Sequence, residues 1–197
     1  MTSKEKILER IRKNSVVENV ELPSSYENFG ITFQQKFEKF STMLESVGGK
    51  ALLIDKKDLD KTIKELYPNE KVIASNIEDF SLKNFEPNNE KEAYNLKDID
   101  LAVVRGNFAV AENGAIWMRN PQNRHRSLYF IAQNIVTILD EKEILNNMHE
   151  AYEKINFENT GGYGVFISGP SKTADIEQSL VIGAHGPKSG YVIFTKS

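Results

Sequence analysis

The 197-residue sequence contains no cysteine. This absence excludes disulfide bonds, zinc sites with thiolate ligands, cysteine nucleophiles and any iron–sulfur cluster held by cysteines of this polypeptide. Only three histidines are present, and no two of them have the spacing of a metal-ligand pair. We therefore expect no bound transition metal.

Long apolar runs and an excess of basic residues are also missing. The apolar runs are only a few residues long, so we expect no segment that spans a membrane. The N-terminus is rich in charged residues and lacks the apolar core of a signal peptide. The formal net charge of -3 comes without a basic stripe, which gives no reason to expect a nucleic-acid partner. These features favour a cytoplasmic protein.

The spacing of apolar residues predicts alternating helices and strands. Phe33, Phe37, Phe40 and Leu44 recur at steps of three and four, which predicts a helix that stops at Gly48-Gly49. We interpret these phenylalanines as core residues. Further helices are expected around 59–66 and 144–155. Short apolar runs predict strands at 51–54, 71–74, 99–104, 134–139, 163–167 and 191–194.

This order of elements indicates βαβ units, and hence an α/β fold with one Rossmann-like domain and a mainly parallel sheet. Ile7, Leu8 and Ile11 predict a short amphipathic helix before it. We therefore divide the chain into an N-terminal helical extension, 1–30, and an α/β domain, 31–197.

The most distinctive segment is the stretch 167–187, which reads ISGPSKTADIEQSLVIGAHGP. An apolar run precedes its polar loop, and an amphipathic run with Ile176, Leu180 and Val181 follows. This order predicts a strand, a loop and a helix N-terminus. Such an arrangement presents backbone N–H groups and hydroxyls to an anion or a carboxylate.

The polar residues of this stretch have two interpretations. Capping by Ser171 or Thr173 and bracing by Asp175 explain some of them as local structure, and the acidic residues argue against a bare phosphate cradle. A ligand-lining role explains the whole set better. The set comprises Ser168, Gly169, Pro170, Ser171, Thr173, Asp175 and Glu177. His185, at the second Gly-Pro corner, is either a proton donor or a turn residue hydrogen-bonded to backbone.

A second candidate is Glu112-Asn113-Gly114, which interrupts the apolar stretch 109–117. Asn-Gly is a strong signal for a plain hairpin turn. An acid with apolar neighbours, by contrast, tends to have a raised pKa and can act as acid, base or nucleophile. An exposed hairpin tip would more naturally carry polar flanks. We therefore expect Glu112 to lie in a pocket shared with the loop 168–171.

Three arginines and a histidine lie close together in the stretch 119–126. Arginine is suited to bidentate recognition of carboxylate or phosphate. The stretch is either a solvated loop or an anion clamp facing Glu112 across a pocket, with Arg124 or Arg126 as the contact.

The two blocks SGPSKTADIE and GAHGP resemble the C-terminal signature of the LUD-domain family of lactate-utilization proteins. A looser resemblance extends back to about Leu101. Members of that family more often have Glu-Thr-Gly where this chain has Glu112-Asn113-Gly114. The stretch 111–114 is also similar, except at its first position, to the Ser-Glu-Asn-Gly motif of coenzyme A transferases, whose glutamate forms an acyl-thioester.

The resemblance implies a fold of the sugar-isomerase and coenzyme A transferase type for 31–197. It also implies a cytoplasmic subunit of a bacterial system that oxidises L-lactate to pyruvate. The iron–sulfur clusters would belong to partner proteins, and this chain would bind no cofactor but a small anionic ligand, or serve assembly. The alternatives are an acyl or coenzyme A transferase or a sugar-phosphate isomerase that uses Glu112, and a scaffold with a vestigial pocket.

Overall fold

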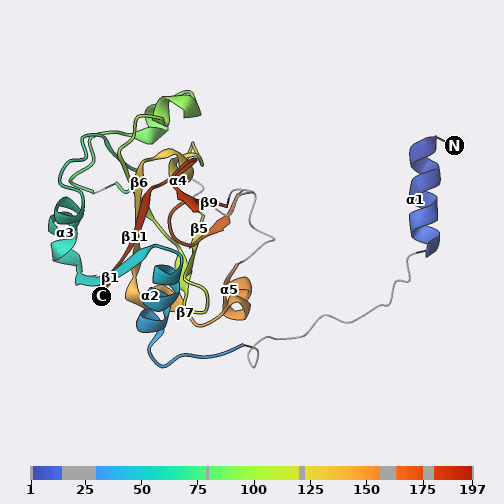
Figure 1. Ribbon diagram of the computed structural model, residues 1–197, viewed down its shortest axis with the longest axis horizontal. Coiled ribbons are helices and arrows are strands. Elements are labelled where there is room, and N and C mark those ends of the chain that lie inside the picture. Colours follow the sequence, from blue (N-terminus) through green and yellow to red (C-terminus); the bar gives the residue numbers. More distant parts are fainter. Residues whose placement is uncertain are drawn as a thin grey trace.

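A computed structural model describes residues 2–14, 30–78, 80–119, 123–155, 163–174 and 180–196. Its centre is a five-stranded sheet in the order β1-β11-β6-β3-β2, in which every neighbouring pair is parallel (Figure 1). The strands are β1 (Lys50–Asp55), β2 (Ile73–Ser75), β3 (Leu101–Arg105), β6 (Asn134–Asp140) and β11 (Ser189–Lys196). The predicted α/β fold with a mainly parallel sheet is confirmed.

Alternating side chains of the central strands fill two separate cores, because successive residues of a strand point to opposite faces of a sheet. On β3, Leu101 and Val103 pack with Ile63 of helix α3 (Leu59–Leu66). Ala102 and Val104 pack on the other face with Phe40 of helix α2 (Lys36–Ser46). The helix predicted from the phenylalanine spacing is therefore present, and Phe37, Phe40 and Leu44 lie in the core as expected. Phe33, also predicted on the helix, lies before its first residue.

A second sheet covers the face of the central sheet that α2 also covers. Its order is β7-β4-β5-β8, and buried residues of β4 and β5 join the same core as α2. Its strands are β4 (Phe108–Val110), β5 (Ala115–Met118), β7 (Ile144–Leu145) and β8 (Val165–Ile167). Figure 1 shows this sheet and α5 (Met148–Lys154) on the side opposite α3. The short helix α4 (Leu128–Ile131) precedes β6.

Two local predictions are wrong. Residues 144 and 145 form β7, and the helix begins only at Met148, because Asn147 caps it by accepting a hydrogen bond from the Glu150 N–H (3.1 Å). The helix expected to follow the loop after β8 is replaced at 180–182 by strand β10 (Leu180–Ile182), which pairs antiparallel with β9 (Lys172–Ala174). Two β-branched residues in β10 favour a strand over a helix.

The N-terminal helix α1 (Ser3–Asn14) is present as predicted, and none of its residues is buried. Its apolar residues Ile7, Leu8 and Ile11 are 56%, 41% and 55% exposed. The proposed boundary between an extension and the α/β domain at residue 30 stays a prediction. Within the described ranges, no helix has the length and apolar character needed to cross a membrane.

A chain of hydrogen bonds ties α3 to the amino-terminal edge of the central sheet. The Tyr67 hydroxyl lies 2.7 Å from Ser189 Oγ, which donates to Asn134 Oδ1 at 2.8 Å. The Asn134 amide in turn donates to Glu70 Oε1 at 2.9 Å. Burial raises the pKa of Tyr67 to about 12.

We expect the Tyr67 network to make the fold sensitive to alkali. The folded pKa lies above the ordinary value of 10.0, so Tyr67 contributes its stability fully below pH 10 and loses it as pH rises through 12. The wild type should therefore lose roughly 2 kcal/mol more than Tyr67→Phe between these pH values. Urea unfolding of both proteins along this pH series measures the difference, and parallel curves would contradict the prediction.

Candidate functional site

A cavity of about 340 Å³ opens between the two Gly-Pro corners of the stretch 167–187. One corner is 168–171, between β8 and β9, and the other is 185–187, before β11. The segment around α4 closes the third side. The lining residues are Tyr129, Phe130, Ile135, Phe166, Ile167, Ser168, Gly169, Pro170, Ser171, Lys172, His185, Gly186 and Pro187.

Backbone hydrogen bonds hold the two corners together. The Ser171 N–H donates to the Pro187 carbonyl at 2.9 Å, and the Gly183 N–H donates to the Ser171 carbonyl at 3.0 Å. Gly186 fits because it lacks a side chain, since a Cβ there would lie 2.9 Å from Ser171 Cβ and 3.2 Å from the Phe130 carbonyl oxygen. The cavity wall is therefore fixed by main chain, and the Ser171 hydroxyl is not used to build it.

The first corner also rests on α2 and on the hairpin between β4 and β5. Gly169 has φ +72, and a Cβ there would lie 2.9 Å from the Val47 carbonyl oxygen at the end of α2. The Ser168 hydroxyl donates to the Gly114 carbonyl at 2.9 Å. Residues far apart in the sequence thus fix the position of the corner.

The titratable groups that line the cavity favour an anion. Lys172 and His185 are exposed at its rim, and no carboxylate occurs among the described lining residues. Tyr129 lies deeper, at 3% exposed, and burial raises the pKa of its hydroxyl. The Asn123 side chain faces that hydroxyl closely enough to lower its pKa in part, yet no hydrogen bond of good geometry joins them. Tyr129 therefore stays neutral at physiological pH.

The expectation that Glu112 shares this pocket is wrong. Glu112 is exposed on the four-residue turn 111–114 between β4 and β5, and it does not line the cavity. Its Oε2 accepts a hydrogen bond from the Met148 N–H at 2.9 Å, at the first turn of α5. A carboxylate is stabilising at a helix N-terminus. The position of Glu112 is therefore that of a helix cap, and its predicted catalytic role has no geometric support.

Asn113 and Gly114 shape the same turn. Asn113 Oδ1 accepts a hydrogen bond from the Ala115 N–H at 3.1 Å, and Gly114 has φ +67. The hairpin interpretation of Asn-Gly is thus the one that the structure confirms. Neither residue lines the cavity, but the Gly114 carbonyl accepts a hydrogen bond from the hydroxyl of Ser168, which does line it.

The predicted arginine clamp facing Glu112 does not form in the described residues. The Arg126 guanidinium lies 4.6 Å from the centre of the Tyr163 ring, a cation–π contact, and does not line the cavity. The backbone N–H of Arg124 donates to Asn88 Oδ1 at 3.0 Å. Both side chains are exposed, as in the alternative of a solvated loop.

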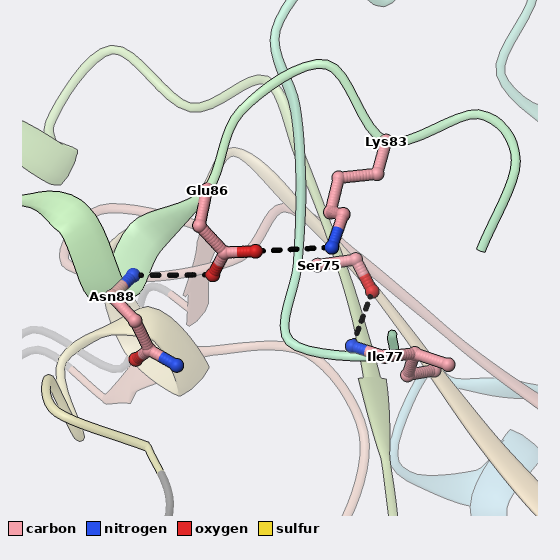
Figure 2. Close-up of polar contacts among 5 residues, drawn as sticks. All are labelled: Ser75, Ile77, Lys83, Glu86 and Asn88. Atoms are coloured by element: carbon pink, nitrogen blue, oxygen red, sulfur yellow. Dashed lines mark hydrogen bonds and ion pairs between the residues drawn. The ribbon is translucent and has the colours of Figure 1, made fainter. Parts of the chain in front are cut away.

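Asn88 belongs to a polar network in the segment after β2. Figure 2 shows Glu86 accepting from the Asn88 N–H (3.4 Å) and pairing with the Lys83 ammonium (3.0 Å). Ser75 Oγ accepts from the Ile77 N–H at 3.1 Å nearby. The network holds the segment that supports the arginine loop, so its polar residues have a structural use.

The remaining predicted site residues divide into three groups. Ser168, Gly169, Pro170, Ser171 and His185 line the cavity, and their roles toward a ligand stay predictions. Thr173 lies in β9, paired with Val181, and does not line it. Asp175 and Glu177 lie outside the described residues, so their predicted roles stay predictions.

Sequence reasoning missed the aromatic wall. Tyr129, Phe130 and Phe166 line the cavity, as does Lys172, and none of these four is among the predicted ligand residues. The available signal was the aromatic pair that follows the arginine loop directly. A short apolar run gives no periodicity from which its exposed face can be read.

Comparison with known proteins adds the evolutionary relationship. The LUD domain family model matches residues 88–195. Lactate utilization protein C of Bacillus pumilus is 31% identical over 109 residues, covering 53% of this chain and 45% of that protein. The protein of the same name from Anoxybacillus flavithermus is 30% identical over 97 residues, covering 49% of this chain and 44% of its own length. The chain thus spans less than half the length of these relatives.

A crystal structure of a DUF162 family protein from Deinococcus radiodurans has a similar fold. It superposes with a TM-score of 0.67 over 84% of this chain and 99% of that chain, at 15% sequence identity. At this identity the likeness supports the architecture alone. The match of the family model covers more than half of the sequence and includes every residue that lines the cavity. The chain belongs to the LUD-domain family.

Proposed function

We propose that this chain acts in the cytoplasm in bacterial lactate utilization, as a subunit that binds a small organic anion and assembles with iron–sulfur proteins. The observation that best supports this proposal is the position of the cavity within the family-matched segment. All of its lining residues fall within 129–187, inside the segment 88–195 that matches the LUD domain. Relatives that match about half of this chain are named for lactate utilization.

The chemistry of the cavity supports an anion-binding role. Its rim carries Lys172 and His185 without a carboxylate among the described lining residues. Its walls are held by main-chain hydrogen bonds between the two corners, so the rim side chains are available to a ligand. Preorganised walls with a few polar groups are typical of small-molecule sites.

The redox chemistry of lactate oxidation would lie in partner proteins. The sequence has no cysteine, and protein-bound iron–sulfur clusters are usually held by cysteine thiolates. The chain would then contribute a ligand site or a contact surface to a complex whose clusters lie elsewhere. A transferase or isomerase role through Glu112 lacks support, because that carboxylate caps α5 outside the cavity.

Deletion of the gene in its own host tests this proposal. We expect the deletion strain to lose growth on L-lactate but not on glucose, and the wild-type gene to restore it. The double variant Lys172→Met and His185→Ala should restore growth poorly, because it removes the ammonium charge and the imidazole from the rim. Lys142→Met, an exposed lysine away from the cavity, is the matched control and should restore growth fully.

Affinity purification from lactate-grown cells tests the assembly. The tagged chain should bring down proteins that contain iron and acid-labile sulfide, whereas the chain purified alone should contain none. Normal growth of the deletion strain on lactate would contradict the proposed role. Iron bound in stoichiometric amount to the isolated chain would contradict the assignment of the clusters to partners.

A further inference from the structure

We propose that the cavity binds a monocarboxylate larger than lactate, in which the carboxylate is joined to an apolar group about the size of an aromatic ring. The inference rests on the proposed function in taking this cavity as the ligand site, and it names the class of ligand. It is carried by three features of the cavity, namely its volume, its aromatic wall and its single full positive charge.

The volume exceeds what lactate needs. Lactate is a three-carbon acid, whereas cavities of roughly 300–1,000 Å³ typically enclose drug-sized ligands. At about 340 Å³, the cavity would leave much of its space to water around a bound lactate. Apolar walls gain nothing from contact with that water. A ligand with an additional apolar portion would displace that water and contact the apolar side chains of the walls.

The aromatic wall of the cavity includes a phenylalanine that is partly exposed to solvent. The Phe130 side chain lines the cavity and is 39% exposed, although its neighbours Leu128 and Tyr129 are buried at 0% and 3%. The Phe130 ring packs edge-on against Tyr129, with centroids 6.1 Å apart. Ile135, Phe166 and Ile167 complete an apolar lining. An apolar ring placed against Phe130 would shield part of its exposed surface from water.

The charged end fits a single carboxylate. Within the described part of the chain, no hydrogen bond or ion pair occupies the Ser171 hydroxyl, the Lys172 ammonium or the His185 ring. The backbone at these corners is already bonded, through the Ser171 N–H and carbonyl. Lys172 supplies one full positive charge, and Ser171 supplies a hydroxyl donor. One charge and one neutral donor match a monocarboxylate better than a phosphate dianion.

Three probes that differ in one feature each test the proposal with the purified full chain. L-3-phenyllactate is lactate with an added ring, and 3-phenylpropane-1,2-diol keeps the ring but replaces the carboxylate with a neutral group. By isothermal titration calorimetry, phenyllactate should bind about tenfold or more tightly than L-lactate, since burial of a ring is worth that much. The diol should bind more weakly than phenyllactate.

Variants assign the two preferences to their residues. Phe130→Ala should remove most of the preference for phenyllactate over lactate, and Phe130→Leu, which keeps an apolar side chain, should retain part of it. Lys172→Met should remove the preference for phenyllactate over the diol. The matched controls are Tyr94→Ala and Lys142→Met, which should change neither preference. Tyr94 is an aromatic residue outside the cavity and is 69% exposed.

The proposal is overturned if phenyllactate does not bind at millimolar concentration, if lactate binds as tightly as phenyllactate, or if Phe130→Ala leaves the preference intact. These outcomes are separate from the growth test. A strain that needs the chain for growth on lactate while the purified chain shows no ring preference would keep the proposed function and refute the ligand class. A purified chain that prefers phenyllactate, together with a deletion strain that grows normally on lactate, would keep the ligand class and refute the proposed function.

Discussion

Phe194→Ala is expected to destabilise the fold by about 3–5 kcal/mol, the range typical of truncating a fully buried phenylalanine. Phe194 lies on β11, an interior strand of the central sheet between β1 and β6, and is 0% exposed. Its ring meets the rings of Phe37 and Phe40 edge-on, with centroids 5.8 and 5.2 Å apart. Truncation would remove both contacts and leave a cavity between α2 and the sheet, where a parallel strand paired on both sides has little freedom to relax.

Urea or guanidinium unfolding of the variant measures this loss as a shift of the midpoint. Tyr94→Ala is the control, because Tyr94 is 69% exposed and its loss should change stability by less than about 0.5 kcal/mol. A loss below about 2 kcal/mol for Phe194→Ala would show that α2 moves inward to fill the space. That result would contradict the interpretation of the phenylalanine stripe as tightly packed.

The parts of this fold that the sequence predicts are those with long periodic patterns. The stripe from Phe37 to Leu44 has a helical spacing over several turns, and it enters the core as predicted. The strand runs β3 and β6 are continuous and apolar, which is typical of parallel strands buried on both faces. Helix and sheet assignments of this kind depend on many residues that agree with one another.

The second sheet as a whole escaped prediction because its strands are short, although a strand was expected at 163–167, which contains β8, and a hairpin turn was one interpretation of Asn113-Gly114. β4 and β8 have three residues each, β5 has four and β7 only two, and so short an apolar run does not identify its partner strand or even its type. The pairing of β8 with β5 in an antiparallel ladder depends on tertiary packing. The aromatic wall of the cavity was missed for the same reason.

Glu112 shows how a correct premise led to a wrong position. Its flanks are buried as predicted, with Ala109, Val110 and Ala111 all at 0% exposure. Burial of the flanks does not fix the direction of a side chain inside a turn. Here the turn directs the carboxylate to the N-terminus of α5, a partner that lies more than thirty residues further along the chain and cannot be read from local sequence.

Gly114→Ala is expected to cost about 2–5 kcal/mol, because two penalties add at this position. Gly114 has φ +67, a conformation that L residues adopt only under strain. A Cβ at this buried position would also lie 2.8 Å from the Leu44 backbone nitrogen and 3.1 Å from its Cα. Backbone atoms of a helix cannot rotate away as a side chain can, so the hairpin and α2 must separate.

Gly48→Ala separates the two penalties. Gly48 has φ +85, but a Cβ there would meet only ordinary contacts, at 3.6 Å from Lys172 Cε and 3.7 Å from Pro170 Cγ. Its replacement should therefore cost only the backbone strain, about 1–2 kcal/mol. The difference between the two variants in chemical unfolding measures the steric part. Equal losses would show that α2 and the hairpin are not in close contact. The hydrogen bond from the Ser168 hydroxyl to the Gly114 carbonyl, which supports the first cavity corner, would then need another explanation.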